Sequence, residues 1–160
     1  RHKEGPKTVV QNSLPENFWD MGDELAPNRV FVNLCENARR YGKTPNLEPI
    51  QVQIEVSIPN SSELQKTIPL LNFPEFSMLK WVLLRDHGSG VKDNELSHLL
   101  TPFYRADNSR SEAIGSGLGL SIVERVVNQI GGKIFINNHP KGGLAIYLGF
   151  PASLAPVVTV

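Results

Sequence analysis

The stretch Gly-Ser-Gly-Leu-Gly-Leu-Ser at residues 115–121 runs directly into an amphipathic pattern, and this junction constrains the fold more than any other feature of the chain. Apolar residues recur at helical spacing over residues 118–130, which predicts a helix that ends at Gly131-Gly132. A glycine loop that opens a helix presents free N–H groups to an anion such as phosphate. The loop lacks the Gly-Lys-Ser/Thr of a Walker loop, and the dinucleotide fingerprint would need its third glycine at position 120. The candidate ligand-binding residues here are Gly115, Gly117, Leu118, Gly119 and Leu120.

A second helix is predicted from Pro27 or Asn28 to Tyr41, before Gly42. One stripe of this helix is apolar and includes Leu34, Cys35 and Ala38. Another stripe is polar and carries Asn33, Asn37, Arg40 and Tyr41. An asparagine oxygen suits Mg2+ when phosphate oxygens complete the coordination, an arginine can meet a phosphate, and a tyrosine ring can stack on a base. The pattern is also that of an ordinary amphipathic helix whose polar side faces solvent.

A third candidate is the sequence Asp86-His-Gly-Ser-Gly90, which follows a short apolar run. A carboxylate only accepts hydrogen bonds, so Asp86 can receive the exocyclic amine of adenine but cannot pair with the carbonyl of guanine. Gly88 and Gly90 have no Cβ to keep the backbone away from a flat ring. A plain turn between a strand and a loop is the alternative interpretation.

A polar, irregular segment over residues 91–114 contains Phe103, a possible anchor for a mobile lid, and Arg105, which could reach a terminal phosphate. A surface loop with one pinned aromatic residue is the alternative. Of the four histidines, His87 lies within the Asp86 loop, and His2, His98 and His139 are expected at the surface.

Strand patterns fill much of the remaining chain. Residues 51–58 alternate strictly between apolar and polar, which predicts a half-buried strand, and residues 81–84 form a short apolar strand. Residues 133–137 and 144–150 flank a Pro-Lys-Gly-Gly turn and are expected to form a hairpin. Helices mixed with three or four strands predict an α+β fold, a two-layer sandwich.

Composition narrows the class of protein. The length of 160 residues suits one domain over residues 1–160. Lys and Arg number 16, and so do Asp and Glu, so there is no basic excess of the kind that binds nucleic acid. The single Cys35 excludes an internal disulfide, and no apolar run reaches the length of a membrane span. The first residues are not a signal peptide, and we expect a fragment of a larger protein.

Together, these motifs resemble the catalytic ATP-binding domain of bacterial sensor histidine kinases, in the superfamily shared with gyrase, Hsp90 and MutL. Residues 33–41 resemble the N box, 86–90 the G1 box, 102–105 the F box and 115–120 the G2 box. The resemblance covers about residues 20–150, and the short lid is most similar to that of the osmolarity-sensor group. It implies a two-layer α/β sandwich with helices on one face of a mixed, mostly antiparallel sheet.

The resemblance also implies roles for individual residues in a site for ATP and Mg2+. Asn37 would ligate Mg2+, with Asn33 on the phosphate side and Arg40 near the β- and γ-phosphates. Tyr41 would stack on adenine, and Asp86 would read its amine. Gly88, Gly90, Phe103 and the residues of the 115–120 loop would complete the nucleotide contacts. The residues implied in catalysis are Asn33, Asn37, Arg40 and Arg105.

Hydrolases of the superfamily place a glutamate, the base for water, where this chain has Asn33. An asparagine has no useful basicity, so the site is better suited to holding ATP for a separate nucleophile. In the kinases that nucleophile is a histidine on a helical dimerisation domain, and its sequence context is absent from this chain. A non-catalytic ATP sensor and an anti-sigma-factor serine kinase are the alternatives.

The resemblance implies two partners, the dimerisation domain of the same kinase and a downstream response regulator. It also implies a cytoplasmic domain whose parent is anchored in the inner membrane, with no contact of this chain with nucleic acid or lipid. One departure is the connection over residues 60–78, which is longer than the usual hairpin and rich in large apolar residues. We expect it to pack on the rest of the domain.

Overall fold

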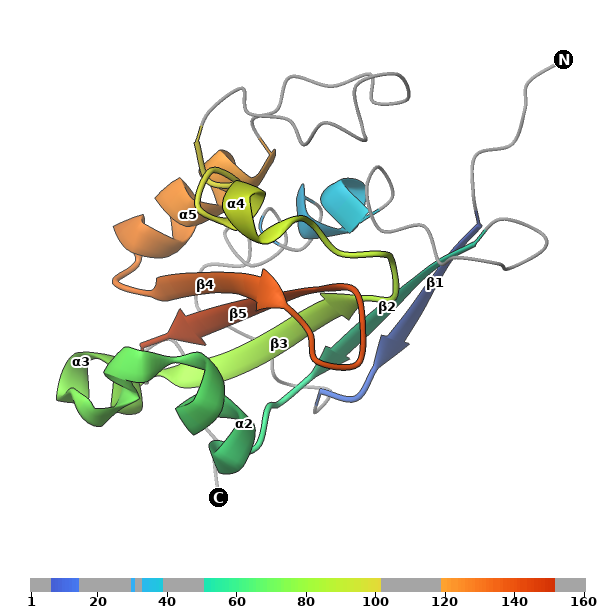
Figure 1. The fold of residues 1–160 in the computed structure, drawn as a ribbon. Coiled ribbons are helices and arrows are strands. Elements are labelled where there is room, and N and C mark those ends of the chain that lie inside the picture. Colours follow the sequence, from blue (N-terminus) through green and yellow to red (C-terminus); the bar gives the residue numbers. More distant parts are fainter. Residues whose placement is uncertain (1–6, 15–29, 31–32, 39–50, 102–118, 152–160) are drawn as a thin grey trace, which may run out of the picture.

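A computed structural model of the chain describes residues 7–14, 30, 33–38, 51–101 and 119–151. Within these residues, one sheet has the strand order β1-β2-β3-β5-β4 (Figure 1). β1 pairs with β2 in parallel, and the other three neighbouring pairs are antiparallel. The expected α/β sandwich with a mixed, mostly antiparallel sheet is confirmed. The strands are β1 (Lys7–Asn12), β2 (Gln51–Ser57), β3 (Lys80–Asp86), β4 (Lys133–Asn138) and β5 (Leu144–Phe150).

The central strand β3 and its neighbour β5 are buried along almost their whole length. Such strands read as continuous apolar runs because both faces of the sheet are covered. The neighbouring strand β2 keeps the predicted alternation, with Ile54 and Val56 only 1% exposed. Ile58 was expected to continue that buried row, but it lies beyond the strand and is 56% exposed.

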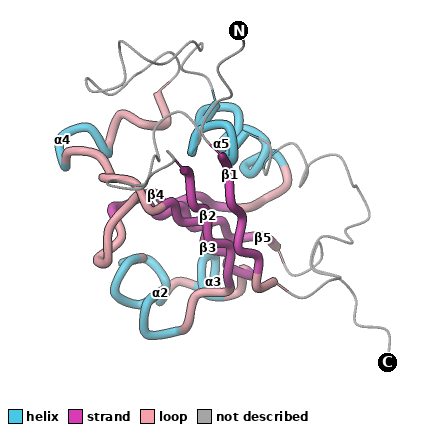
Figure 2. Tube along the Cα trace, turned by 90° about the vertical axis from the view of Figure 1, so that its right-hand side faces the viewer, coloured by secondary structure: helices cyan, strands magenta, loops and turns pink. Residues whose placement is uncertain are grey.

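The longer helix α5 (Gly119–Gln129) and the helical residues 33–38 cover one face of the sheet (Figures 1 and 2). Val123 and Val127 are completely buried in the same cluster as Leu34 of the other helix. Strand residues of β2, β3 and β5 complete this cluster, which is the main core. We call this side of the sheet the helix face.

α5 ends where the sequence predicts, and the hydrogen bonds give the reason. Gly131 takes a positive φ of 81° and its N–H bonds to the carbonyl of Asn128, while the N–H of Gly132 bonds to the carbonyl of Val127. This pair of bonds is a Schellman motif, in which glycine supplies the left-handed residue without strain. It turns the chain directly into β4.

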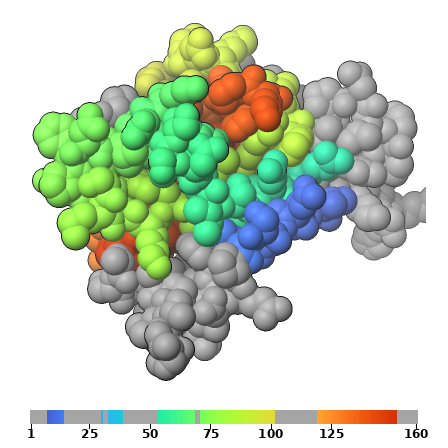
Figure 3. Space-filling view, turned by 90° about the horizontal axis from the view of Figure 1, so that it is seen from below, coloured from blue at the N-terminus to red at the C-terminus, as the bar shows by residue number. Residues whose placement is uncertain are grey.

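The connection between β2 and β3 folds onto the opposite face, which we call the outer face. It forms α2 (Ser61–Thr67), a 3-10 helix η1 (Pro69–Asn72) and α3 (Pro74–Ser77). A second apolar cluster joins these helices to the sheet through Ile68, Trp81, Leu83, Ala145 and Tyr147. Figure 3 shows the green segment spread over this face, with β1 at the sheet edge. We expected helices on one face only, and the structure places α2, η1 and α3 on the other face as well.

Candidate nucleotide site

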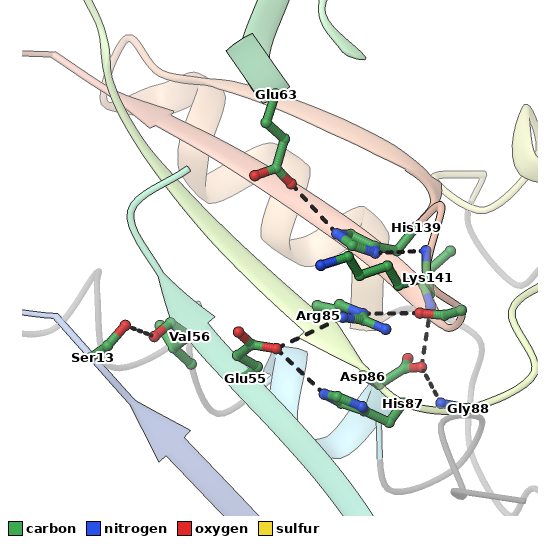
Figure 4. A network of polar contacts seen from close by, with 12 residues as sticks. Ser13, Glu55, Val56, Glu63, Arg85, Asp86, His87, Gly88, His139 and Lys141 are labelled. Atoms are coloured by element: carbon green, nitrogen blue, oxygen red, sulfur yellow. Dashed lines mark hydrogen bonds and ion pairs between the residues drawn. The ribbon is translucent and has the colours of Figure 1, made fainter. Parts of the chain in front are cut away.

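Asp86 ends β3, and the alternation of the strand places it on the helix face beside Leu84. The residue is 5% exposed. Its Oδ1 accepts two hydrogen bonds, from the N–H of Gly88 at 2.9 Å and from the N–H of Leu144 at 3.1 Å (Figure 4). Oδ2 takes no part in either bond. The two bonds to Oδ1 therefore fix the orientation of the carboxylate. Oδ2 can accept a hydrogen bond from a donor on a ligand.

Burial raises the pKa of the Asp86 carboxyl above its usual range, because a charged group loses hydration there. The two backbone N–H groups, and after them the electrostatic influence of His87 and Arg85, act in the opposite direction. The balance leaves a carboxylate whose charge is expensive to keep in the folded protein. Such a group is typical of a binding or catalytic site.

The loop that follows Asp86 is held at successive points along its backbone. The N–H of His87 bonds to the carbonyl of Gln53 in β2 at 3.1 Å. Gly90 has a positive φ of 73°, which favours glycine. Beyond it, both backbone groups of Val91 bond to the side chain of Asn138. Hydrogen bonds thus hold the loop at both of its ends, and Val91 packs on the main core of the helix face.

The charged groups beside the loop lie on the outer face. Arg85 points there because it alternates with Asp86, and its Nη1 is 3.8 Å from Oε2 of Glu55. The same carboxylate oxygen is 3.4 Å from Nε2 of His87 (Figure 4). Nε of Arg85 also donates to the carbonyl of Gly142 at 2.9 Å. Arg85 therefore ties the end of β3 to the β4–β5 turn.

The helical residues 33–38 present the two predicted asparagines. Leu34 and Ala38 are buried to 1% and 2% exposure, which fixes how the helix sits on the sheet. Asn33 and Asn37 are one turn apart and half-buried. Burial, and to a lesser degree the charge of Glu36, raises the pKa of the neighbouring Cys35 thiol, so this cysteine stays protonated at neutral pH.

The start of α5 supplies the third described part of the predicted site. Among the described residues, an added Cβ at Gly119 would meet nothing within 4 Å. Leu120 is 6% exposed and belongs to the main core. Any contact of Leu120 with a ligand would therefore come from its backbone N–H. The remaining predicted residues, Arg40, Tyr41, Phe103, Arg105, Gly115, Gly117 and Leu118, lie outside the described residues.

The described parts of the predicted site gather on the helix face. Leu34, Leu120 and Val91 all contact the main core, so the asparagine helix, the start of α5 and the loop after Asp86 share that core. Among the described residues, no group of three or more His, Cys, Asp or Glu side chains could hold a metal ion. No helix of the described ranges is long and apolar enough to cross a membrane.

Sequence reasoning missed the role of the β4–β5 turn, which reaches the Asp86 loop through Asn138 and Leu144. Its Gly142-Gly143 pair was seen only as a hairpin signal. Gly143 has a positive φ of 82°, and a Cβ there would collide with the backbone oxygen of Asp86. The prediction that His139 is a surface residue was also wrong. Its side chain is 12% exposed, and Nε2 lies 3.5 Å from Oε1 of Glu63.

Comparison with solved structures identifies the class to which this fold belongs. The mycobacterial sensor histidine kinase MprB superposes with a TM-score of 0.61 at 21% identity, over 92% of this chain and 84% of that chain. The catalytic domain of histidine kinase ThkA gives 0.58 at 17% identity, over 92% and 79%. At this level of identity the likeness concerns the fold, which is that of histidine kinase catalytic domains.

The family follows from sequence. Residues 22–154 match the model of the histidine kinase-, DNA gyrase B- and HSP90-like ATPases, and the chain belongs to that family. It is 32% identical over 143 residues to the signal transduction histidine-protein kinase BaeS of Escherichia coli (strain K12), covering 89% of this chain and 26% of BaeS. It is 39% identical over 135 residues to AfsQ2 of Streptomyces coelicolor, covering 82% and 21%. The chain thus spans about a quarter of these histidine kinases.

Proposed function

We propose that this chain is the ATP-binding catalytic domain of a two-component sensor kinase and supplies the γ-phosphoryl group to a histidine on a separate dimerisation domain. The observation that carries the proposal is the buried Asp86 carboxylate, fixed through Oδ1 by two backbone N–H groups. Oδ2 would accept the exocyclic amine of adenine. Guanine presents a carbonyl at that position, so the same oxygen would repel it.

Mg2+ would enter this site together with the nucleotide. Among the described residues, no cluster of three acidic, His or Cys side chains offers the ion a set of protein ligands. Mg2+ commonly takes one protein ligand and fills the rest with phosphate oxygens and water. The Asn37 amide oxygen would be that ligand, and the ion when bound neutralises charge on the phosphates.

Asn33 has a further consequence for the reaction. An amide cannot take a proton from water, so the side chain would orient the phosphates without activating a hydrolytic nucleophile. Phosphoryl transfer depends on positioning and charge stabilisation, which Arg40, Arg105 and the 115–120 loop would supply. A histidine presented by another domain then serves as the acceptor. We infer that the partners are this dimerisation domain and, downstream, a response regulator, and that the parent kinase is anchored in the inner membrane.

Thermal unfolding with and without nucleotide tests the binding step. Mg-ATP should raise the melting temperature, and Mg-GTP should leave it unchanged. At a ligand concentration 100 times the dissociation constant, binding adds about 2.7 kcal/mol to the free energy of unfolding. For a domain of this size, that energy corresponds to roughly 5–10 °C. An unchanged melting temperature at millimolar Mg-ATP would remove the binding proposal.

Phosphotransfer separates the kinase from the two other readings. The chain alone should hydrolyse Mg-ATP very slowly, and it should phosphorylate a supplied helical domain that carries the acceptor histidine. Binding of ATP without transfer would favour a sensor module, and transfer to serine would favour an anti-sigma-factor kinase. Rapid hydrolysis without an acceptor would contradict the role given to Asn33.

A further inference from the structure

The β4–β5 turn touches the end of β3 and the Asp86 loop at three separate places. The N–H of Leu144 bonds to Oδ1 of Asp86, and the carbonyl of Gly142 accepts from Nε of Arg85. The third contact, through Asn138, reaches Val91 at the far end of the loop. The loop is therefore fixed at its beginning and at its end by one turn that lies elsewhere in the sequence.

Asn138 makes the contact that sets the shape of the loop. Its Oδ1 accepts from the N–H of Val91 at 2.9 Å, and its Nδ2 donates to the carbonyl of Val91 at 2.6 Å. One amide side chain thus satisfies both backbone groups of one residue, as a neighbouring strand would. Asparagine is suited to this because it combines an acceptor and a donor at a short, rigid reach.

Gly90 fits the same arrangement. It has a positive φ of 73°, and a Cβ at this position would collide with Oδ1 of Asn138. The close approach of the amide and the left-handed backbone therefore depend on each other. Together they determine the path of the chain between Gly88, whose N–H holds the Asp86 carboxylate, and Val91.

We propose that Asn138 is a positioning residue for base recognition, which holds the Asp86–Val91 loop in the conformation that receives adenine. The inference rests on the proposed function, because it assumes that Asp86 reads the base. A loop that is ordered before binding saves the free energy of ordering it on binding. Loss of the Asn138 amide should thus weaken contacts with the base and leave contacts with the phosphates unchanged.

The test compares Asn138→Ala with Asn137→Ala, a matched control one residue earlier in β4. Asn137 is exposed, and its Oδ1 accepts a local bond from the N–H of Asn138. Calorimetry would measure the affinity of each folded variant for Mg-ATP and for Mg-tripolyphosphate, a probe without a base. We expect Asn138→Ala to raise the dissociation constant of Mg-ATP by about 10-fold, with tripolyphosphate and the control unchanged.

A second variant, Asn138→Asp, has nearly the same size and shape as wild type, and it controls for the possibility that Asn138→Ala weakens binding by disturbing the fold. It retains an acceptor for the N–H of Val91 and replaces the donor to the carbonyl of Val91 with a repelling oxygen. It should also weaken Mg-ATP selectively, and the Val91 amide should exchange faster with solvent in Asn138→Ala, which removes its acceptor. Wild-type affinity for Mg-ATP in both, or an equal loss for Mg-ATP and tripolyphosphate, would overturn the role of Asn138. Failure of the wild-type chain to bind Mg-ATP would instead overturn the proposed function.

Discussion

At the scale of the single residue, two requirements on Asp86 oppose each other. Recognition of an amine needs an ionised carboxylate, but burial at 5% exposure makes that charge costly. Two backbone N–H groups offset part of the cost by bonding to Oδ1. A side chain with the same shape but no charge would keep both of these bonds. The residue is thus better explained by binding than by stability.

Asp86→Asn tests that explanation directly. The asparagine Oδ1 can still accept from the N–H groups of Gly88 and Leu144, while Nδ2 replaces the oxygen that, on the proposed function, would accept from adenine. We expect Mg-ATP affinity to fall about 10- to 100-fold, the range for one hydrogen bond to a charged group. The melting temperature without nucleotide should hold or rise at neutral pH. A variant that binds Mg-ATP as tightly as wild type would show that Asp86 does not read the base.

The difference in unfolding free energy between wild type and Asp86→Asn should change with pH in one direction. Because the folded pKa of Asp86 is raised, its contribution to stability is complete below the unfolded pKa and is lost as pH rises through the folded pKa. The unfolded carboxyl titrates near pH 4, at about 3.9. Urea unfolding from below pH 4 to neutrality should therefore show Asp86→Asn gaining stability relative to wild type as pH rises. A constant difference would contradict the buried charge.

At the scale of the element, the β4–β5 turn is also held from the outer face. His139 accepts the N–H of Lys141 at Nδ1, and its Nε2 faces Glu63 of α2. Oε1 of Glu63 also accepts from the hydroxyl of Tyr147, and burial is the main reason that the pKa of this tyrosine rises to about 12. The geometry at His139 requires the neutral imidazole, because protonation of Nδ1 would break the bond to Lys141.

This arrangement predicts a weakening of the turn in mild acid. Burial first, and then the charge of Arg85, lower the pKa of His139, although Glu63 and Glu55 partly oppose the change. Stability from the neutral ring is complete above the unfolded pKa, near 6.5, and is lost as pH falls through the folded pKa. Wild type should therefore lose unfolding free energy relative to His139→Ala as pH drops below about 6.5. Parallel profiles for the two proteins would contradict the role of His139.

Helix α5 and strand β2 could be predicted because their signals are local, whereas the short helices α2, η1 and α3 were expected only as a long connection. Helix α5 has an apolar stripe and a Gly-Gly end, and β2 has a period of two, so neighbouring residues carry enough information. The bonds that shape the Asp86 loop are different in kind. They join residues 47 positions apart at Val91 and Asn138, and 58 apart at Asp86 and Leu144. No periodicity encodes such pairings, so only the folded sheet reveals them.

At the scale of the whole molecule, the sheet separates the candidate site on one face from a second apolar cluster on the other. The helix face carries the main core, Asp86 and the asparagine helix, whereas the outer face carries the second cluster under α2, η1 and α3. Covering both faces explains why β5 and the middle of β3, from Trp81 to Leu84, are continuous apolar runs. The outer layer thus contributes mainly to stability, and one polar connection from it toward the site passes through Glu63 to His139 in the β4–β5 turn.

Ile68→Ala on the outer face is expected to lower stability without changing the affinity for Mg-ATP. Ile68 is 1% exposed and anchors the outer layer beside Trp81 and Tyr147, so its truncation should cost about 2–5 kcal/mol of unfolding free energy. Phe73→Ala is the control, because Phe73 is 57% exposed on the same layer and its loss should cost little. Mg-ATP affinity, measured by calorimetry well below the melting temperature of each variant, should match wild type in both. Weaker binding by Ile68→Ala while it remains fully folded would mean that packing on the outer face determines the geometry of the Asp86 loop, and that the two faces are energetically coupled through the sheet.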